Sequence, residues 1–157
     1  MTSIRFEALP SDIANAYRRG EPDSYGLRPE RRISDGCGVP CRHCLRQVSA
    51  GDAYLIVAHR PFPALQPYAE TGPIFLHAEA CERHMPSDAL PPVLHDSPDF
   101  IVRGYGFDDR IVYGTGAVVP IEQITERASA LFGSAEVAYL HVRSARNNCY
   151  QCRIDRS

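Results

Sequence analysis

A pair of cysteines two residues apart, Cys41 and Cys44, constrains the fold of this chain more than any other feature of its sequence. A tight turn with this spacing points both sulfurs at one position, which is the arrangement that a bound metal ion requires. A β-prone run at residues 54–59 follows, and residues 74–76 predict a second strand. We therefore expect a tight turn that is followed by a strand pair.

A second group of ligating residue types follows the predicted strand pair. Residues 78–85 have the composition of a short helix that ends at Pro86. On a helix, positions four and seven apart lie along one face, so His77, Cys81 and His84 would point the same way. The sequence therefore predicts a helix that carries histidine and cysteine toward the turn.

The order of turn, strand pair and helix is typical of a treble-clef zinc module, which here would span residues 37–85. Zinc favours four tetrahedral nitrogen and sulfur ligands, and three cysteines with one histidine form a common closed set. His84 would replace His77 if His77 belonged to the preceding strand. The alternative is that the thiols are buried as small apolar groups. The predicted zinc ligands are Cys41, Cys44, His77 and Cys81.

Three further cysteines are expected to lie outside this site. Cys37 precedes the turn and is a fifth candidate ligand, although a loop thiol is the simpler interpretation. Cys149 and Cys152 repeat the two-residue spacing, but their segment is predicted to be a strand, in which side chains three apart point to opposite faces. These two sulfurs would therefore not share a metal ion.

Length and charge set the class of protein. A chain of 157 residues is long enough to bury its own core, and we expect a single domain over residues 1–157. The net charge of −2 argues against a nucleic-acid binder or a membrane-surface protein. We find no membrane-spanning run and no pattern of a secretory signal. We therefore expect a cytoplasmic protein, in which thiols stay reduced.

The rest of the chain predicts a strand-rich α+β domain. Ser11 is an N-cap candidate for a short helix that reaches Arg19, and residues 20–40 are predicted to be a loop. Pro120 is placed to begin an amphipathic helix that reaches Phe132, near the C-terminal third. Further strands are expected at residues 4–9, 99–105, 110–113, 136–142 and 149–154.

The proline-rich loop between the two middle strands is an alternative functional site. Its prolines prevent regular structure, and loops of this kind often form binding pockets. Arg60 would bind an anion there, while Tyr68 and Glu70 would take proton or hydrogen-bond roles, with Cys41 or His77 nearby. The simpler interpretation is that the loop only packs against the fold and that Glu70 pairs with Arg60.

Four stretches resemble a known family, namely residues 40–45, 60–63, 67–77 and 148–153, which read PCRHCL, RPFP, PYAETGPIFLH and NCYQCR. They are similar to the bacterial family called domain of unknown function 1203, and the similarity extends over residues 6–153. The resemblance implies a compact cytoplasmic bacterial protein. It implies no activity.

The resemblance also bears on the site. Some branches of that family lack the second cysteine of the turn, which implies that zinc is a feature of this branch and that the shared site lies elsewhere. The residues implied for the shared site are Cys41, Arg42, Tyr68 and Glu70.

Three functional hypotheses remain open, because no reaction follows from these residues. The first is a small cytoplasmic binding or interaction protein with a structural zinc and a protein or small-molecule partner. The second is an enzyme or small-anion binder that uses residues 60–70. The third is a thiol redox protein in which Cys41 and Cys44 form a reversible disulfide. Chemistry that needs a lysine is excluded, since all 17 basic residues are arginines.

Overall fold

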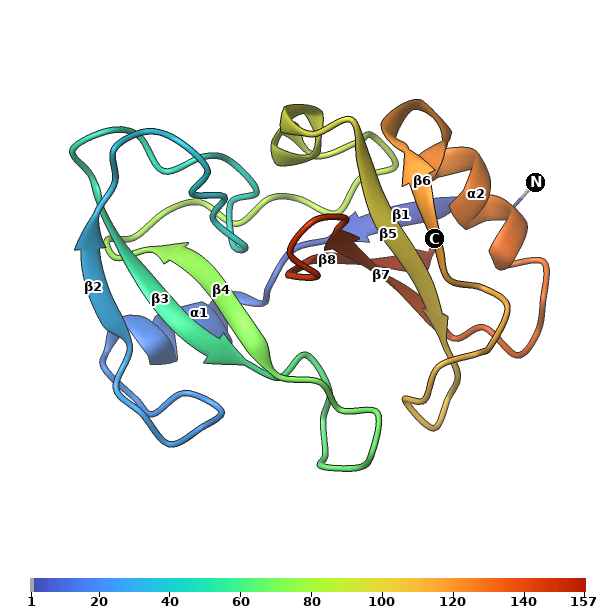
Figure 1. Cartoon of the computed structure of the whole chain (residues 1–157), viewed down its shortest axis with the longest axis horizontal. Helices are drawn as coiled ribbons and strands as arrows, with labels where there is room; N and C mark the ends of the chain where they lie inside the picture. The colour runs from blue at the N-terminus through green and yellow to red at the C-terminus, as the bar shows by residue number, and fades with distance from the viewer. Residues whose placement is uncertain (1) are drawn as a thin grey trace.

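Two antiparallel sheets form the fold, which the computed structural model describes for residues 2–157 (Figure 1). The larger sheet has five strands in the order β1-β8-β7-β5-β6, and the smaller has the order β2-β3-β4. The larger sheet contains β1 (Ile4–Glu7), β5 (Asp99–Tyr105), β6 (Ala117–Pro120), β7 (Tyr139–Ser144) and β8 (Tyr150–Arg156). The other elements are β2 (Glu30–Ile33), β3 (Ala53–His59), β4 (Gly72–His77), the helices α1 (Ser11–Arg18) and α2 (Ile124–Leu131), and the 3-10 turns η1 (Pro92–Asp96) and η2 (Ile121–Gln123).

The first and the last strand of the described chain both belong to the larger sheet. β1 pairs with β8, and the N–H of Ser157 donates to the carbonyl of Ser3 at 3.0 Å. Between β1 and β5 the chain leaves this sheet and forms α1 and the whole smaller sheet, which lies on the left of Figure 1. The smaller sheet is therefore an insertion between the first two strands of the larger one.

The side chains of β3, the central strand of the smaller sheet, alternate in burial. Ala53, Leu55, Val57 and His59 are buried, whereas the residues between them are only half-buried. A period of two places one set of side chains on the inner face of a strand. His59 is the last of these buried residues, so its imidazole lies on the inner face of the sheet at the C-terminal end of β3.

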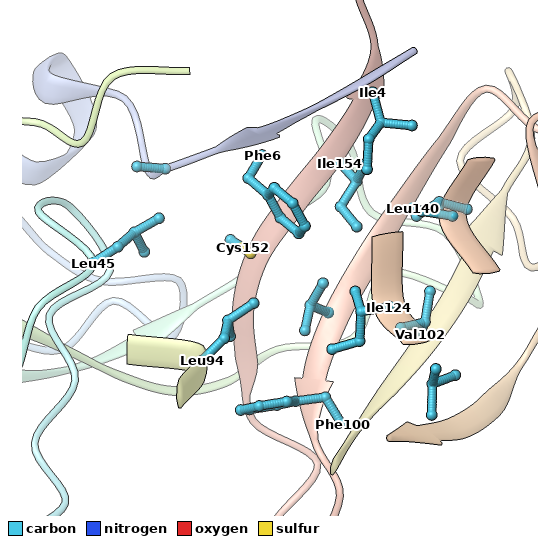
Figure 2. Close-up of a cluster of buried hydrophobic side chains, with 14 of the residues drawn as sticks. Ile4, Phe6, Leu45, Leu94, Phe100, Val102, Ile124, Leu140, Cys152 and Ile154 are labelled. Carbon is cyan, nitrogen blue, oxygen red and sulfur yellow. The ribbon is translucent and has the colours of Figure 1, made fainter. Parts of the chain in front are cut away.

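The main core lies between the larger sheet and α2 (Figure 2). Figure 2 shows Phe6, Leu140 and Ile154 on neighbouring strands, directed toward the space that Ile124 of α2 also occupies. Burial of each such side chain stabilises the fold by about 1.5–3 kcal/mol. Leu45 belongs to this core too, although it directly follows the cysteine turn.

A second core lies on the inner face of the smaller sheet. It joins this sheet to α1 and to the cysteine turn, so the turn is part of a packed interior and not an exposed loop. Its buried members are Leu9, Ala14, Tyr17, Val39, Cys41, Cys44, Val48, Leu55, Val57, Ile74, Leu76 and Tyr150.

The helix predicted for residues 78–85 is wrong. The chain after β4 is irregular, and it is held by hydrogen bonds to distant segments. Arg83 donates to the carbonyl of Ala8 at 2.6 Å, and the N–H of His84 donates to the carbonyl of His43 at 2.9 Å. Helices this short are marginal on their own, so these tertiary contacts decide the conformation.

Two strand predictions are also wrong. β2 lies within residues 20–40, which were expected to be a loop; its charged, exposed residues pair with β3 at the edge of the smaller sheet. Conversely, residues 110–113 do not form a strand. Only an isolated bridge joins Ile111 to Tyr105, and β6 is the hairpin partner of β5.

Both helices begin at different residues from those expected. Pro10 is the N-cap of α1, and the Ser11 hydroxyl bonds instead to Nε2 of His43 at 2.8 Å. Pro120 ends β6, and η2 separates it from α2. Ile124 and Ala128 form the buried apolar face of α2, as expected for an amphipathic helix.

The predicted class is confirmed as α+β and strand-rich, with an amphipathic helix near the C-terminal third. Across residues 2–157, none of the helices has the length and apolar character that a membrane crossing needs.

Candidate metal centre

The turn that carries the first two cysteines is held by its backbone. The N–H of Leu45 donates to the carbonyl of Cys41 at 2.9 Å. Leu45 has a left-handed φ of 55°, which reverses the chain directly after Cys44. The N–H of Arg42 donates to the carbonyl of Phe75 at 3.0 Å, and this contact places the turn beside β4.

Four ligand atoms converge beside this turn. Cys41 and Cys44 are buried, His77 is the last residue of β4, and Cys81 lies in the irregular segment that follows. Their sulfur and ring-nitrogen atoms all lie within 4.8 Å of one another. The Sγ atoms of Cys41 and Cys81 are 3.9 Å apart, and Sγ of Cys44 is 3.5 Å from Nδ1 of His77. This group can hold a metal ion, and its members are the four predicted ligands.

Two residues that were not predicted for the site form hydrogen bonds with Cys81. Nη2 of Arg18 donates to its Sγ at 2.9 Å, and Nε of Arg18 donates to the carbonyl of His77 at 3.0 Å. Nδ1 of His43 lies 3.1 Å from the same Sγ, while its Nε2 lies 2.8 Å from Oγ of Ser11. Outer contacts of this kind orient ligands and stabilise the charge on a thiolate.

The three sulfurs share their protons. Hydrogen bonds from the Cys44 and Cys81 thiols hold the pKa of Cys41 well below its usual range. The same contacts raise the pKa of Cys44 and of Cys81, because each proton is held against Cys41. The first negative charge therefore lies on Cys41, which also accepts the N–H of His77 at 3.3 Å. A bound cation would displace the remaining thiol protons.

The position of the histidine ligand differs from the predicted layout. His77 ends a strand and does not begin a helix, but it remains within the group because the chain after β4 turns back toward the cysteine turn. His84, expected as its replacement in that case, lies outside the group, and its Nδ1 donates to the carbonyl of Met85 at 2.9 Å.

Arg42, which the family resemblance placed in a shared site, is a buried connecting residue. It is only 2% exposed; its Nε donates to the carbonyl of Tyr150 at 2.7 Å and its Nη1 to that of Pro40 at 2.6 Å. Its guanidinium also lies 5.7 Å from the ring centre of Phe75. Burial lowers the pKa of Arg42 to about 10. This side chain ties the cysteine turn to β8.

The residues of the proline-rich loop do not converge on one point. Glu70 accepts hydrogen bonds from Arg103 at 2.8 Å and from Arg143 at 3.1 Å, so the predicted pairing with Arg60 is wrong. Tyr68 bonds through its hydroxyl to another tyrosine at the surface. Arg60 lines a separate cavity, away from Glu70 and Tyr68.

The other three cysteines lie apart from the metal ligands. Cys37 is exposed, Cys149 is half-buried, and Cys152 is buried in the main core. Burial raises the pKa of Cys152 to about 12. In the described part of the chain all six thiols are free.

Sequence reasoning missed the two residues that contact Cys81, for different reasons. His43 lies between the two cysteines of the turn, and that position was an available signal. Arg18 has no such signal, because it is separated from His77 by 59 positions and meets it only through the packing of α1.

The two sheets and the partly buried group of three cysteines and one histidine define an α+β protein with a candidate metal centre. The chain belongs to the family described as protein of unknown function DUF1203, whose model matches residues 38–156. The matched region contains all four candidate ligands, and it confirms the resemblance seen in the sequence. No curated protein and no solved structure matches the chain.

Proposed function

We propose that this protein is a small cytoplasmic binding or interaction protein in which Cys41, Cys44, His77 and Cys81 hold a structural zinc ion. The observation that carries the proposal is the spacing of the ligand atoms. With Zn–S bonds of about 2.3 Å and Zn–N bonds of about 2.0–2.1 Å, a tetrahedral site has S···S edges of about 3.8 Å and S···N edges of about 3.5 Å. Here the Sγ atoms of Cys41 and Cys81 are 3.9 Å apart, Sγ of Cys44 is 3.5 Å from Nδ1 of His77, and all four ligand atoms lie within 4.8 Å of one another.

The chemistry of the ligands favours zinc over other ions. Three thiols and an imidazole are soft or borderline donors, whereas magnesium and calcium prefer oxygen ligands. The protein supplies all four positions of a tetrahedron, which is the composition of a structural site and leaves no position for a substrate. A compartment that keeps thiols reduced suits such a site, which supports the cytoplasm as its location.

The charges around the site also support a zinc ion. Three thiolates and Zn²⁺ carry a net charge of −1, and the guanidinium of Arg18, 2.9 Å from Sγ of Cys81, offsets it. The site joins the cysteine turn, the end of β4 and the segment after it. Zinc would therefore hold together one side of the smaller sheet.

Metal analysis of the purified chain tests this proposal. We expect one zinc per chain, and absorption of a tetrahedral cobalt thiolate after substitution with cobalt. The variants Cys44→Ser and Cys81→Ser should lose the metal, whereas the control Cys37→Ser, at an exposed thiol outside the site, should retain it.

Two outcomes would overturn the zinc proposal. One is a metal-free protein that is as stable after chelation as before it. The other is a reversible disulfide between Cys41 and Cys44, detected by counting thiols before and after reduction, which would favour the thiol redox hypothesis.

A further inference from the structure

A cavity of about 400 Å³ lies at the junction of the two sheets, away from the candidate metal ligands. Its volume is within the range of pockets that bind small molecules, and such pockets are common where two parts of a fold meet. Its wall is formed by the end of β3, the loop that follows β3, the segment between β1 and α1, and the strands β7 and β8. The residues that matter for the argument are Leu9, His59, Arg60, Phe62, His141 and Tyr150.

His141 is the first sign that this cavity takes a ligand. The residue is 1% exposed, and its Nδ1 is buried with no hydrogen-bond partner within residues 2–157. Aromatic rings surround the imidazole: the centres of Tyr105, Tyr150 and Phe62 lie 4.7, 4.8 and 5.1 Å from its own. A buried polar group without a partner is costly, and His141 lines the cavity, so a ligand that reaches this imidazole would complete its hydrogen bonds.

A bulge in β8 builds the wall around His141. Val142 pairs with Cys152 and Arg143 pairs with Tyr150, so Gln151 is an extra residue on β8. In a regular strand without a bulge, Tyr150 and Cys152 are two residues apart and would share one face, so Tyr150 would point into the main core. The bulge turns Tyr150 to the side of His141 instead, and bulges with this effect are frequent next to functional sites.

The charges of the cavity favour an anion. Arg83 pairs with Glu7 at 3.3 Å, and Arg153 pairs with Asp155 at 2.8 Å. Arg60 has no carboxylate partner in the described chain.

Among the described residues, the side chain of Arg60 makes a single hydrogen bond, from Nε to the carbonyl of Phe62 at 3.2 Å. The cavity therefore has one unneutralised guanidinium beside a wall of apolar and aromatic side chains.

We propose that this cavity binds a small organic acid. The carboxylate of the ligand pairs with Arg60, its apolar body packs against Leu9 and Phe62, and a polar group at its far end forms a hydrogen bond with His141. A bare inorganic anion would leave the apolar wall and His141 without contacts. The proposal does not depend on the zinc ion, because none of the four candidate ligands lines the cavity.

Calorimetric titration with benzoate, benzyl alcohol and acetate tests the proposal on the full-length chain. We expect benzoate to bind, with benzyl alcohol and acetate weaker by about tenfold or more, because one lacks the charge and the other the apolar body. Arg60→Gln should weaken benzoate binding by about tenfold or more. The matched control Arg28→Gln, at an exposed arginine outside the cavity, should bind as the unaltered protein does.

The role of His141 is tested separately with 4-hydroxybenzoate. This probe should bind more tightly than benzoate to the unaltered protein, and the difference should disappear in His141→Phe. The ratio of two affinities in the same variant does not depend on its overall stability. Absence of saturable benzoate binding at millimolar concentrations would overturn the proposal. Equal benzoate affinity in Arg60→Gln and the unaltered protein would overturn it as well.

Discussion

Leu45 shows how one residue connects the cysteine turn to the main core. Its backbone has a φ of 55°, a region that costs a side chain such as leucine about 1–2 kcal/mol. Its side chain is fully buried, and Figure 2 shows it at the left edge of the core. The burial of the side chain offsets the backbone strain.

We therefore expect Leu45→Ala to lower the free energy of unfolding by about 2–4 kcal/mol, since it removes the buried side chain and keeps the strained backbone. Urea denaturation measures the change. Leu65→Ala, at a residue that is 80% exposed, is the control and should change the free energy by less than about 0.5 kcal/mol. Equal unfolding midpoints for the two variants would contradict the role assigned to Leu45.

His59 makes the stability of the fold depend on pH. Burial, with the nearby charges of Arg42 and Arg60, lowers the pKa of His59 to about 4. The unfolded chain has a histidine pKa of about 6.5, so between these values the unfolded state binds a proton that the folded state does not. Stability is then complete above about pH 6.5 and falls as the pH decreases toward 4.

The contribution of His59 should be about 2 kcal/mol of stability lost between pH 7 and pH 5. In His59→Gln this part of the loss should be absent. Unfolding free energies at the two pH values, compared with those of the control His95→Gln at an exposed histidine, isolate the effect. If the loss were the same in both variants, His59 would not be its source.

At the scale of elements, the position of α1 against the segment after β4 is what completes the candidate metal centre. Nη2 and Nε of Arg18, near the end of α1, bind Cys81 and the carbonyl of His77. The helix thus replaces the predicted local helix as the support for the fourth ligand. A contact of this kind is expected to affect metal retention more than folding.

We expect Arg18→Met to weaken zinc binding by about 10–100-fold, because the thiolate of Cys81 loses its charged donor. Competition with a chromophoric chelator measures the affinity. Arg19→Met is the matched control, since Arg19 is the next residue and, within residues 2–157, pairs only with the exposed Glu21. Similar zinc affinities in the two variants would show that the Arg18 contact does not support the site.

At the scale of the whole molecule, the two sheets differ in their position relative to the candidate metal centre. The larger sheet contains the first and last strands, β1 and β8, and one side of the main core, whereas all four candidate ligands lie beside the smaller sheet. Loss of the ion should therefore loosen one part of the fold first. Proteins open in such cooperative units with different free energies.

Hydrogen exchange with and without a chelator tests this difference. After zinc removal we expect faster exchange of the amides in β3 and β4, while those in β7 and β8 keep most of their protection. Uniform acceleration in both sheets would show that the molecule opens as a single unit.

Much of the fold and the candidate ligand set could be predicted from local sequence patterns. β3 follows from alternating apolar residues, the stripe of α2 from helical periodicity, and the four candidate ligands from residue type and spacing. These signals are local, because a strand or helix face depends on a few neighbouring residues. β2 gave no such signal, since all its side chains are exposed at an edge.

The sequence by itself therefore determined which residues could bind a metal and which segments would form most of the sheets. The tertiary structure alone decided that residues 78–85 stay irregular, that Glu70 pairs with Arg103 and Arg143, and that His59, Arg60 and His141 line one cavity. The physical reason is that these outcomes depend on hydrogen bonds and charges between segments far apart in the chain. Local propensity is too weak to set them.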